Sequence, residues 1–104
     1  MSAAKQFVDA AIVDNKVVVF SKTFCPYCKM AKSALQGCGG KFTTIELENR
    51  SDCAAIQDYL LKLTGGRSVP RVFIGGKFVG GGTDVEQLKK EKKLTPMLQS
   101  VGAL

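Results

Sequence analysis

The apolar positions of this chain fall in short blocks, and the spacing within each block predicts a particular element. Phe7, Ala10, Ala11 and Val13 recur at helical spacing, so the first segment is predicted to be a short amphipathic helix ending near Asn15. Further along, uninterrupted apolar blocks alternate with longer segments of helical period. This alternation of strands with helices is typical of an α/β fold.

A strand, a helix and a second strand are predicted next. The continuous apolar run Val17 to Phe20 fits a strand buried on both faces, and the segment from Phe42 to Leu47 alternates as a second strand. Between them a helix is expected to begin at Cys25. Its apolar side comprises Met30, Ala31, Ala34 and Leu35, and it is broken by Gly37, Gly39 and Gly40. Such a βαβ unit should have parallel strands and a right-handed crossover.

The middle of the chain predicts a helix followed by a β-hairpin. Ser51 or Asp52 can cap the helix, and Gly65-Gly66 ends it. Its apolar positions are Ile56, Tyr59, Leu60 and Leu63. Strands over residues 71–74 and 77–80 are separated by Gly75-Gly76 alone, which is a strong signal for a tight hairpin.

Two more helices complete the expected fold. Thr83 and Glu86 have the spacing of a capping box, and Thr95-Pro96 begins a final helix bearing Met97, Leu98 and Val101. At 104 residues the chain has room for one modest core, so residues 1–104 are expected to form one domain. The predicted architecture is a four-stranded mixed sheet flanked by about five helices.

The first candidate for chemistry is a pair of thiols, Cys25 and Cys28, at the predicted strand-to-helix junction. On a helix these residues span one turn with Cα atoms roughly 5–6 Å apart, within the range that a disulfide needs. Pro26 suits the first helical turn, where a missing N–H costs nothing. Cys25 would lie at the helix N-terminus, where free amides and the helix dipole favour a thiolate. The pair is therefore predicted to form and break a disulfide without backbone movement.

The number of cysteines and the net charge bear on whether the chain binds a metal or a nucleic acid. The chain has four cysteines and no histidine, and Cys38 and Cys53 do not form a second close pair, so no metal is expected. Cys53 should be a small buried or half-buried helix residue, whereas Cys38, between glycines, should be exposed and oxidisable. The net charge is +6, but the densest basic cluster, residues 89–93, fits a solvated helix face better than a nucleic-acid patch.

Composition also bears on location. No apolar run approaches the roughly 20 residues of a membrane span, and Lys5 and Asp9 argue against a secretory signal. A secreted disulfide scaffold would be richer in cysteine. We therefore expect a cytoplasmic protein with no membrane or nucleic-acid partner, while a targeting segment ahead of this sequence stays open as an alternative.

Two glycine- or proline-containing segments could complete a site around the thiols. A cis Val69-Pro70 bond would leave the Val69 N–H and carbonyl free to pair with an extended peptide, although a trans proline that only starts a strand is the alternative. The glycines ahead of Thr83 allow a ligand to approach amides that can bind a carboxylate, and Asp84 could accept from an ammonium group. A plain strand-to-helix turn is the alternative here.

Together with Lys22 and the Cys25-Pro26-Tyr27-Cys28 motif, these segments make nearly the whole chain resemble the glutaredoxins, specifically the dithiol class with a C-P-Y-C active site. The resemblance implies a thioredoxin-like fold with a cis-proline facing the active site. It implies a glutathione-dependent thiol-disulfide oxidoreductase that reduces protein–glutathione mixed disulfides and protein disulfides. Glutathione would be the co-substrate, glutathionylated and disulfide-containing proteins the partners, and the chain a monomer.

The resemblance further implies a set of glutathione-binding residues. They are Lys22, Tyr27, Gln57, Arg67, Ser68, Val69, Pro70, Gly81, Gly82, Thr83 and Asp84. Within this set, Lys22, Gln57 and Arg67 would hold the glycine carboxylate, and Tyr27 would flank the tripeptide. The Val69 backbone would pair with the cysteinyl part.

The Thr83 amide and Asp84 would receive the γ-glutamyl carboxylate and ammonium groups. The chain departs from the family pattern at two of these positions. Ser68 replaces a threonine that many members have, which should be a mild change. Gly82 replaces a cysteine of many animal members, so no regulatory disulfide can form at that position.

In the implied reaction Cys25 is the nucleophile and Cys28 resolves some of its intermediates. Three other interpretations remain. A thioredoxin-type enzyme normally carries W-C-G-P-C, but this chain has no tryptophan. A dimer binding a [2Fe–2S] cluster through glutathione is less expected with Pro26 in the motif. A non-enzymatic zinc module is the third.

Overall fold

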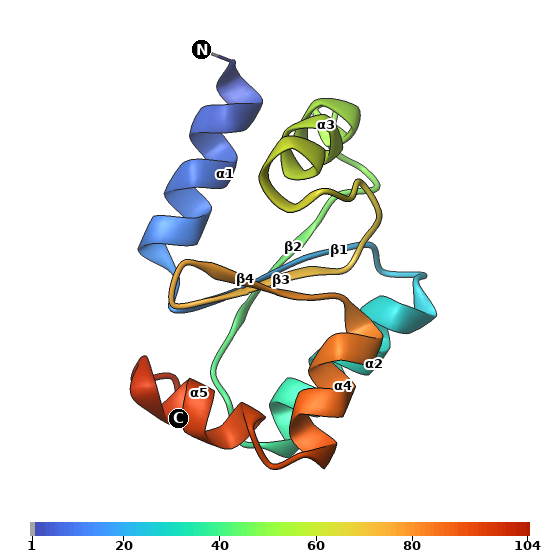
Figure 1. Cartoon of the computed structure of the whole chain (residues 1–104). Coiled ribbons are helices and arrows are strands. Elements are labelled where there is room, and N and C mark those ends of the chain that lie inside the picture. The colour runs from blue at the N-terminus through green and yellow to red at the C-terminus, as the bar shows by residue number, and fades with distance from the viewer. Residues whose placement is uncertain (1) are drawn as a thin grey trace.

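The computed structural model describes residues 2–104 and contains a four-stranded mixed sheet with five helices (Figure 1). The elements in chain order are α1 (Ala3–Asp14), β1 (Val17–Ser21), α2 (Pro26–Gly37), β2 (Thr43–Glu46), α3 (Cys53–Thr64), β3 (Arg71–Ile74), β4 (Lys77–Gly80), α4 (Gly82–Lys90) and α5 (Leu94–Ser100). Within this described part of the chain, no helix combines the length and apolar character needed to cross a membrane.

The strands lie in the order β2-β1-β3-β4. β1 is parallel to β2 and antiparallel to β3, and β3 is antiparallel to β4. The predicted βαβ unit and mixed sheet are therefore confirmed. In this order β1 is central, so its carboxyl end lies between the two neighbouring strands where side chains from both can meet.

Helices cover both faces of the sheet: α1 and α3 lie on one side, and α2, α4 and α5 on the other (Figure 1). Successive side chains of β1 point to opposite faces, so Val17 and Val19 pack with α2, α4 and α5, whereas Val18 and Phe20 pack with α1 and α3. All five residues of β1 are buried. Burial on both faces explains why this strand is continuously apolar in sequence.

Two helices turn faces to the sheet that differ in part from those predicted. In α1 the buried residues are Ala4, Val8 and Ala11, while Ala10 is exposed and Val13 is 82% exposed. Both α1 and α3 carry more apolar residues than one stripe facing the sheet can hold. The spacing alone therefore did not show which of these residues face the sheet. In α3, Leu63 is likewise exposed rather than part of the core.

The predicted start of α4 is also wrong, because the helix was expected to open at Thr83 and its N-cap lies two residues earlier. The N-cap is Gly81, and Asp84 accepts a hydrogen bond from the Gly81 N–H at 2.9 Å. Thr83 therefore lies inside the first turn instead of capping it. Asp84 supplies the carboxylate half of a capping arrangement and also complements the positive end of the helix dipole.

The hairpin between β3 and β4 has the predicted boundaries. Gly75 and Gly76 both have positive φ, 59° and 80°, as a two-residue turn of the I′ type requires. A Cβ atom at Gly75 would lie 2.6 Å from Cγ1 of Val101, whereas a Cβ at Gly76 would meet nothing within 4 Å. An alanine at Gly76 would therefore suffer backbone strain alone, whereas an alanine at Gly75 would also overlap Val101.

We expect Gly76→Ala to lower the free energy of unfolding by about 1–2 kcal/mol, because an alanine in this left-handed conformation is strained. Gly75→Ala should lower it further, since its methyl group also overlaps Val101. Gly76→Asn is the matched control and should cost less, because asparagine tolerates this region. Urea denaturation measures all three, and equal losses for the two alanine variants would contradict the steric argument.

Candidate functional site

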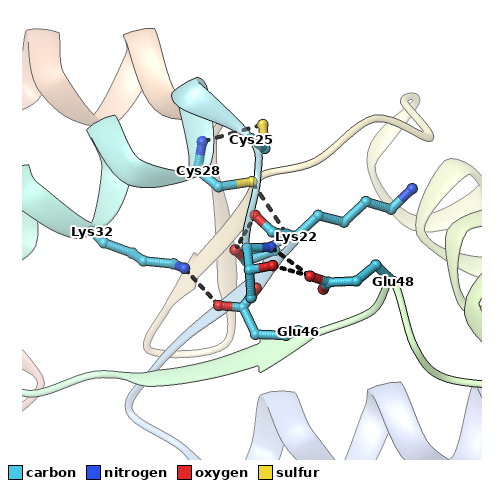
Figure 2. Close-up of polar contacts among 8 residues, drawn as sticks. Lys22, Cys25, Cys28, Lys32, Glu46 and Glu48 are labelled. Carbon is cyan, nitrogen blue, oxygen red and sulfur yellow. Dashed lines mark hydrogen bonds and ion pairs between the residues drawn. The ribbon is translucent and has the colours of Figure 1, made fainter.

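The two thiols lie where β1 ends and α2 begins, as predicted (Figure 2). Cys25 is the N-cap of α2, and its sulfur accepts a hydrogen bond from the Cys28 amide at 3.4 Å. The Cys25 amide in turn donates to the Lys22 carbonyl at 3.2 Å, which closes the loop between strand and helix. Cys25 is half-exposed and Cys28 is completely buried, so only Cys25 is presented to a substrate.

The environment of Cys25 favours the thiolate. Partial burial raises the pKa of Cys25, but hydrogen bonds from the Cys28 amide, the Cys28 thiol and the Tyr27 amide act in the opposite direction. The positive charge of Lys22 adds to them, and together they hold the pKa of Cys25 below its ordinary value. This is the microenvironment of a reactive cysteine.

Cys28 has the opposite character. Its burial raises the pKa of the thiol, and the neighbouring Cys25 raises it further. The Lys22 amide, which donates to the Cys28 sulfur at 3.4 Å, and the Ser21 hydroxyl only partly offset this. The pair therefore combines a nucleophilic thiolate with a thiol that stays protonated.

The Val69-Pro70 segment lies directly against the nucleophile. Its peptide bond is cis, as the resemblance implied, and the Val69 carbonyl oxygen is 3.8 Å from the Cys25 sulfur. Pro70 is buried and Val69 is half-buried. Residues 44 positions apart in sequence are thus brought together at one point of the site.

The start of α4 forms the third side of the site. A Cβ atom at Gly82 would lie 2.4 Å from the Tyr27 carbonyl oxygen, so α4 can approach the first turn of α2 this closely only with glycine there. A Cβ at Gly81 would lie 3.5 Å from the Pro70 carbonyl oxygen. The thiol motif, the cis-proline and the glycines ahead of Thr83 are therefore mutual neighbours, as expected.

The remaining predicted residues lie on α3 and the loop after it. Gln57 is buried, and its side-chain amide donates to the Arg67 carbonyl at 2.9 Å. The exposed Arg67 guanidinium pairs with Asp58 at 2.8 Å. Gln57 and Arg67 are thus together at the edge of the site, with Gln57 bracing the loop. Their predicted contact with a carboxylate stays a prediction.

One residue of this loop region was missed by the sequence analysis. The Arg71 guanidinium donates to the Ser68 carbonyl at 2.8 Å and to the Ser68 hydroxyl at 3.2 Å, and it lies over the Phe78 ring at 5.2 Å. Arg71 therefore braces the segment that ends in Val69. The sequence feature that could have indicated this role is the arginine directly after Pro70, at the first position of a strand.

The other two cysteines lie outside the site. Cys53 is half-buried, as predicted, and its sulfur donates to the Gln57 side-chain oxygen at 3.4 Å. Cys38 was expected to be exposed, but it caps the end of α2 and packs half-buried against the core, because the chain turns back there toward β2. Among residues 2–104, no group of three or more cysteine, aspartate or glutamate side chains is placed to hold a metal ion.

Known proteins with this sequence pattern and geometry are glutaredoxins. The family model described as Glutaredoxin matches residues 17–79. Glutaredoxin-C2 of Arabidopsis thaliana is 46% identical over 104 residues, covering 100% of this chain and 90% of that protein.

Two solved structures are similar over almost the whole chain. Oxidized glutaredoxin 2 from Chlamydomonas reinhardtii has a TM-score of 0.92 and 56% identity, covering 97% of this chain and 95% of its own. A buckwheat glutaredoxin–glutathione complex has a TM-score of 0.93 and 46% identity, covering 97% and 92%.

The electrostatic account of Cys25 predicts how its alkylation depends on pH. Because the pKa of Cys25 is lowered, its reaction with iodoacetamide should persist at pH values where an ordinary thiol is protonated, and should fall only as the pH drops through that lowered pKa. Lys22→Met should slow alkylation at low pH by about two- to fivefold, the size expected for one partly exposed charge. Lys29→Met is the control, and an equal effect there would contradict the assignment to Lys22.

Proposed function

The chain belongs to the glutaredoxin family, and from that premise we propose that it reduces protein–glutathione mixed disulfides and protein disulfides through Cys25. It is a glutathione-dependent thiol-disulfide oxidoreductase with a thioredoxin-like fold. The observation that carries the proposal is the Cys25 sulfur at the start of α2, with a lowered pKa and 3.8 Å from the Val69 carbonyl.

Glutathione would lie across the three neighbouring segments of the site. Its cysteinyl part would pair with the Val69 backbone, which sets its sulfur beside Cys25. The glycine carboxylate would be held by Lys22, Gln57 and Arg67. This assignment is supported by the positive charges of Lys22 and Arg67 and by the hydrogen bond from the Gln57 side chain to the Arg67 carbonyl.

The γ-glutamyl end would lie at the start of α4. There the Thr83 amide, in the first turn of the helix, would donate to the carboxylate, and Asp84 would accept from the ammonium group. Tyr27 is 55% exposed and would flank the tripeptide. Ser68, Pro70, Gly81 and Gly82 would shape the walls between these contacts.

The monothiol branch needs Cys25 alone. Its thiolate attacks the glutathione sulfur of a mixed disulfide, the S–S bond breaks, and the protein thiolate leaves with the electron pair. A second glutathione, as thiolate, then attacks the glutathione sulfur on Cys25. Glutathione disulfide is released and the Cys25 thiolate returns.

The dithiol branch adds Cys28. In this branch the Cys28 thiol loses its proton and attacks Cys25, so that a Cys25–Cys28 disulfide forms and the bound thiol is released. Glutathione later reduces that disulfide. The raised pKa of Cys28 keeps it a thiol until it is needed.

We further propose that the protein acts as a monomer in the cytoplasm. The alternative of a dimer holding a [2Fe–2S] cluster has no specific observation in its favour among the described residues. We therefore keep the oxidoreductase as the one proposed function.

Substitution of each cysteine in turn tests the separate roles proposed for Cys25 as the nucleophile and Cys28 as the resolving thiol. Cys25→Ser should abolish turnover of a small glutathione mixed disulfide in the presence of glutathione and glutathione reductase, because no other thiol is exposed at the start of α2. Cys28→Ser should retain this turnover but lose reduction of protein disulfides. Glutathione-dependent turnover that survives in Cys25→Ser would refute the proposed function.

Arg71 provides a test of the binding segment. Arg71→Met removes the two hydrogen bonds to Ser68, so we expect the KM for the mixed disulfide to rise about three- to tenfold, with kcat little changed. Arg71→Lys keeps the charge but loses the planar fork and should give an intermediate KM. An unchanged KM in Arg71→Met would mean that the Val69 segment does not depend on this brace.

A further inference from the structure

A short series of hydrogen bonds joins the start of α3 to the loop that leads to Pro70. Cys53 is the first residue of α3 and Gln57 follows it by four positions, so both side chains leave the helix on one face. The Cys53 thiol donates to Oε1 of Gln57, with sulfur and oxygen 3.4 Å apart. Nε2 of Gln57 donates to the Arg67 carbonyl at 2.9 Å. A thiol outside the active-site motif is therefore connected, through one amide group, to a predicted glutathione-binding segment.

The two contacts agree on a single orientation of the Gln57 amide. Turning this group by 180° would exchange its oxygen, which only accepts, with its NH₂ group, which only donates. The Arg67 carbonyl can only accept, so the group that faces it has to be the NH₂ group. The amide oxygen is then directed to Cys53, whose thiol can donate to it. Cys53 and the Arg67 carbonyl thus hold the amide from its two ends.

Burial makes this orientation matter. The Gln57 side chain is only 8% exposed, and within residues 2–104 the donor to its Oε1 atom is the Cys53 thiol. A buried amide oxygen that loses its donor is costly, so the side chain would turn or move to find another partner. Cys53 itself is half-buried against the core on the α1 and α3 side of the sheet. The core therefore fixes the place from which the thiol donates.

The same orientation leaves Gln57 with a donor for a ligand. Nε2 carries two hydrogens, and its hydrogen bond within residues 2–104, to the Arg67 carbonyl, uses one of them. The Arg67 guanidinium lies along α3, where it donates to Asp58 at 2.8 Å and to the Ala54 carbonyl at 3.5 Å. Two groups predicted to hold the glycine carboxylate of glutathione are thus both attached to the first half of α3.

We propose that Cys53 is a positioning residue for glutathione, whose thiol orients the Gln57 amide so that its second N–H is presented to the glycine carboxylate. The inference rests on the proposed function, and within it on the predicted contact between Gln57 and that carboxylate. Cys53 does not touch the tripeptide and takes no part in the exchange of thiols. Its effect is on the binding of one end of the substrate.

A purely structural role for Cys53 is the competing explanation, and it predicts a different pattern of effects. If Cys53 only fills space at the start of α3, its loss would shift the loop that carries Val69. Every substrate whose cysteinyl part pairs with the Val69 backbone would then bind less well. A positioning role through Gln57 affects only those substrates that have a glycine carboxylate.

Steady-state kinetics with two matched substrates test the proposal. They are the mixed disulfides of cysteine with glutathione and with γ-glutamylcysteine, which lacks the glycine, each reduced at a fixed concentration of glutathione with glutathione reductase. Cys53→Ala should raise the KM for the glutathione substrate about two- to fivefold, the size of one weak hydrogen bond, with kcat little changed. Its KM for the γ-glutamylcysteine substrate should equal that of the wild type.

Three further variants sharpen the result. Cys53→Ser keeps a donor at this position and should return the KM for the glutathione substrate close to the wild-type value. Gln57→Ala should raise this KM by itself, and adding Cys53→Ala to it should raise it no further, because the thiol acts only through Gln57. Cys38→Ala is the matched control, since it removes a half-buried thiol at the other end of α2 and should leave both KM values unchanged.

An unchanged KM in Cys53→Ala would overturn the proposal. So would an equal rise for both substrates, or an equal rise in Cys53→Ser and Cys53→Ala, since either would indicate packing rather than donation. If Gln57→Ala leaves the KM unchanged, the predicted carboxylate contact and this inference fall together, while the oxidoreductase activity stands. If the wild type does not turn over the glutathione substrate, the proposed function itself has failed.

Discussion

The hydrogen bond from the Cys28 amide to the Cys25 sulfur is the contact through which this fold acts on its chemistry. It requires that α2 begin at Cys25, with Pro26 occupying a position that needs no donor. It also requires a thiol that stays half-exposed while the rest of the helix is anchored. Cys28, one turn later, supplies that anchor because its side chain is buried against the end of β1.

The central strand holds the other parts of the site in place around this bond. Since β1 is buried on both faces and lies between β2 and β3, its end is the point where several elements converge. The Val69-Pro70 segment leads into β3 on one side of β1, and β2 lies on the other side. The reactive sulfur is therefore partly exposed, whereas the resolving sulfur is buried against the end of β1.

Local signals in the sequence predicted most of the fold and the centre of the site. The βαβ unit, the hairpin at Gly75-Gly76 and the start of α2 at the thiol motif depend on neighbouring residues, and all were confirmed. What the sequence could not predict depends on how elements are rotated and which distant groups meet. The buried face of α1, the brace from Arg71 to Ser68 and the pairing of Lys32 with Glu46 are of this kind.

The close contact between Gly82 and the Tyr27 carbonyl limits how this active site could evolve. A side chain at position 82 would push the start of α4 away from the first turn of α2. A chain with this helix spacing therefore cannot acquire an extra thiol there by one substitution. A third cysteine at this position would need the start of α4 and the first turn of α2 to move apart locally, in addition to the new side chain.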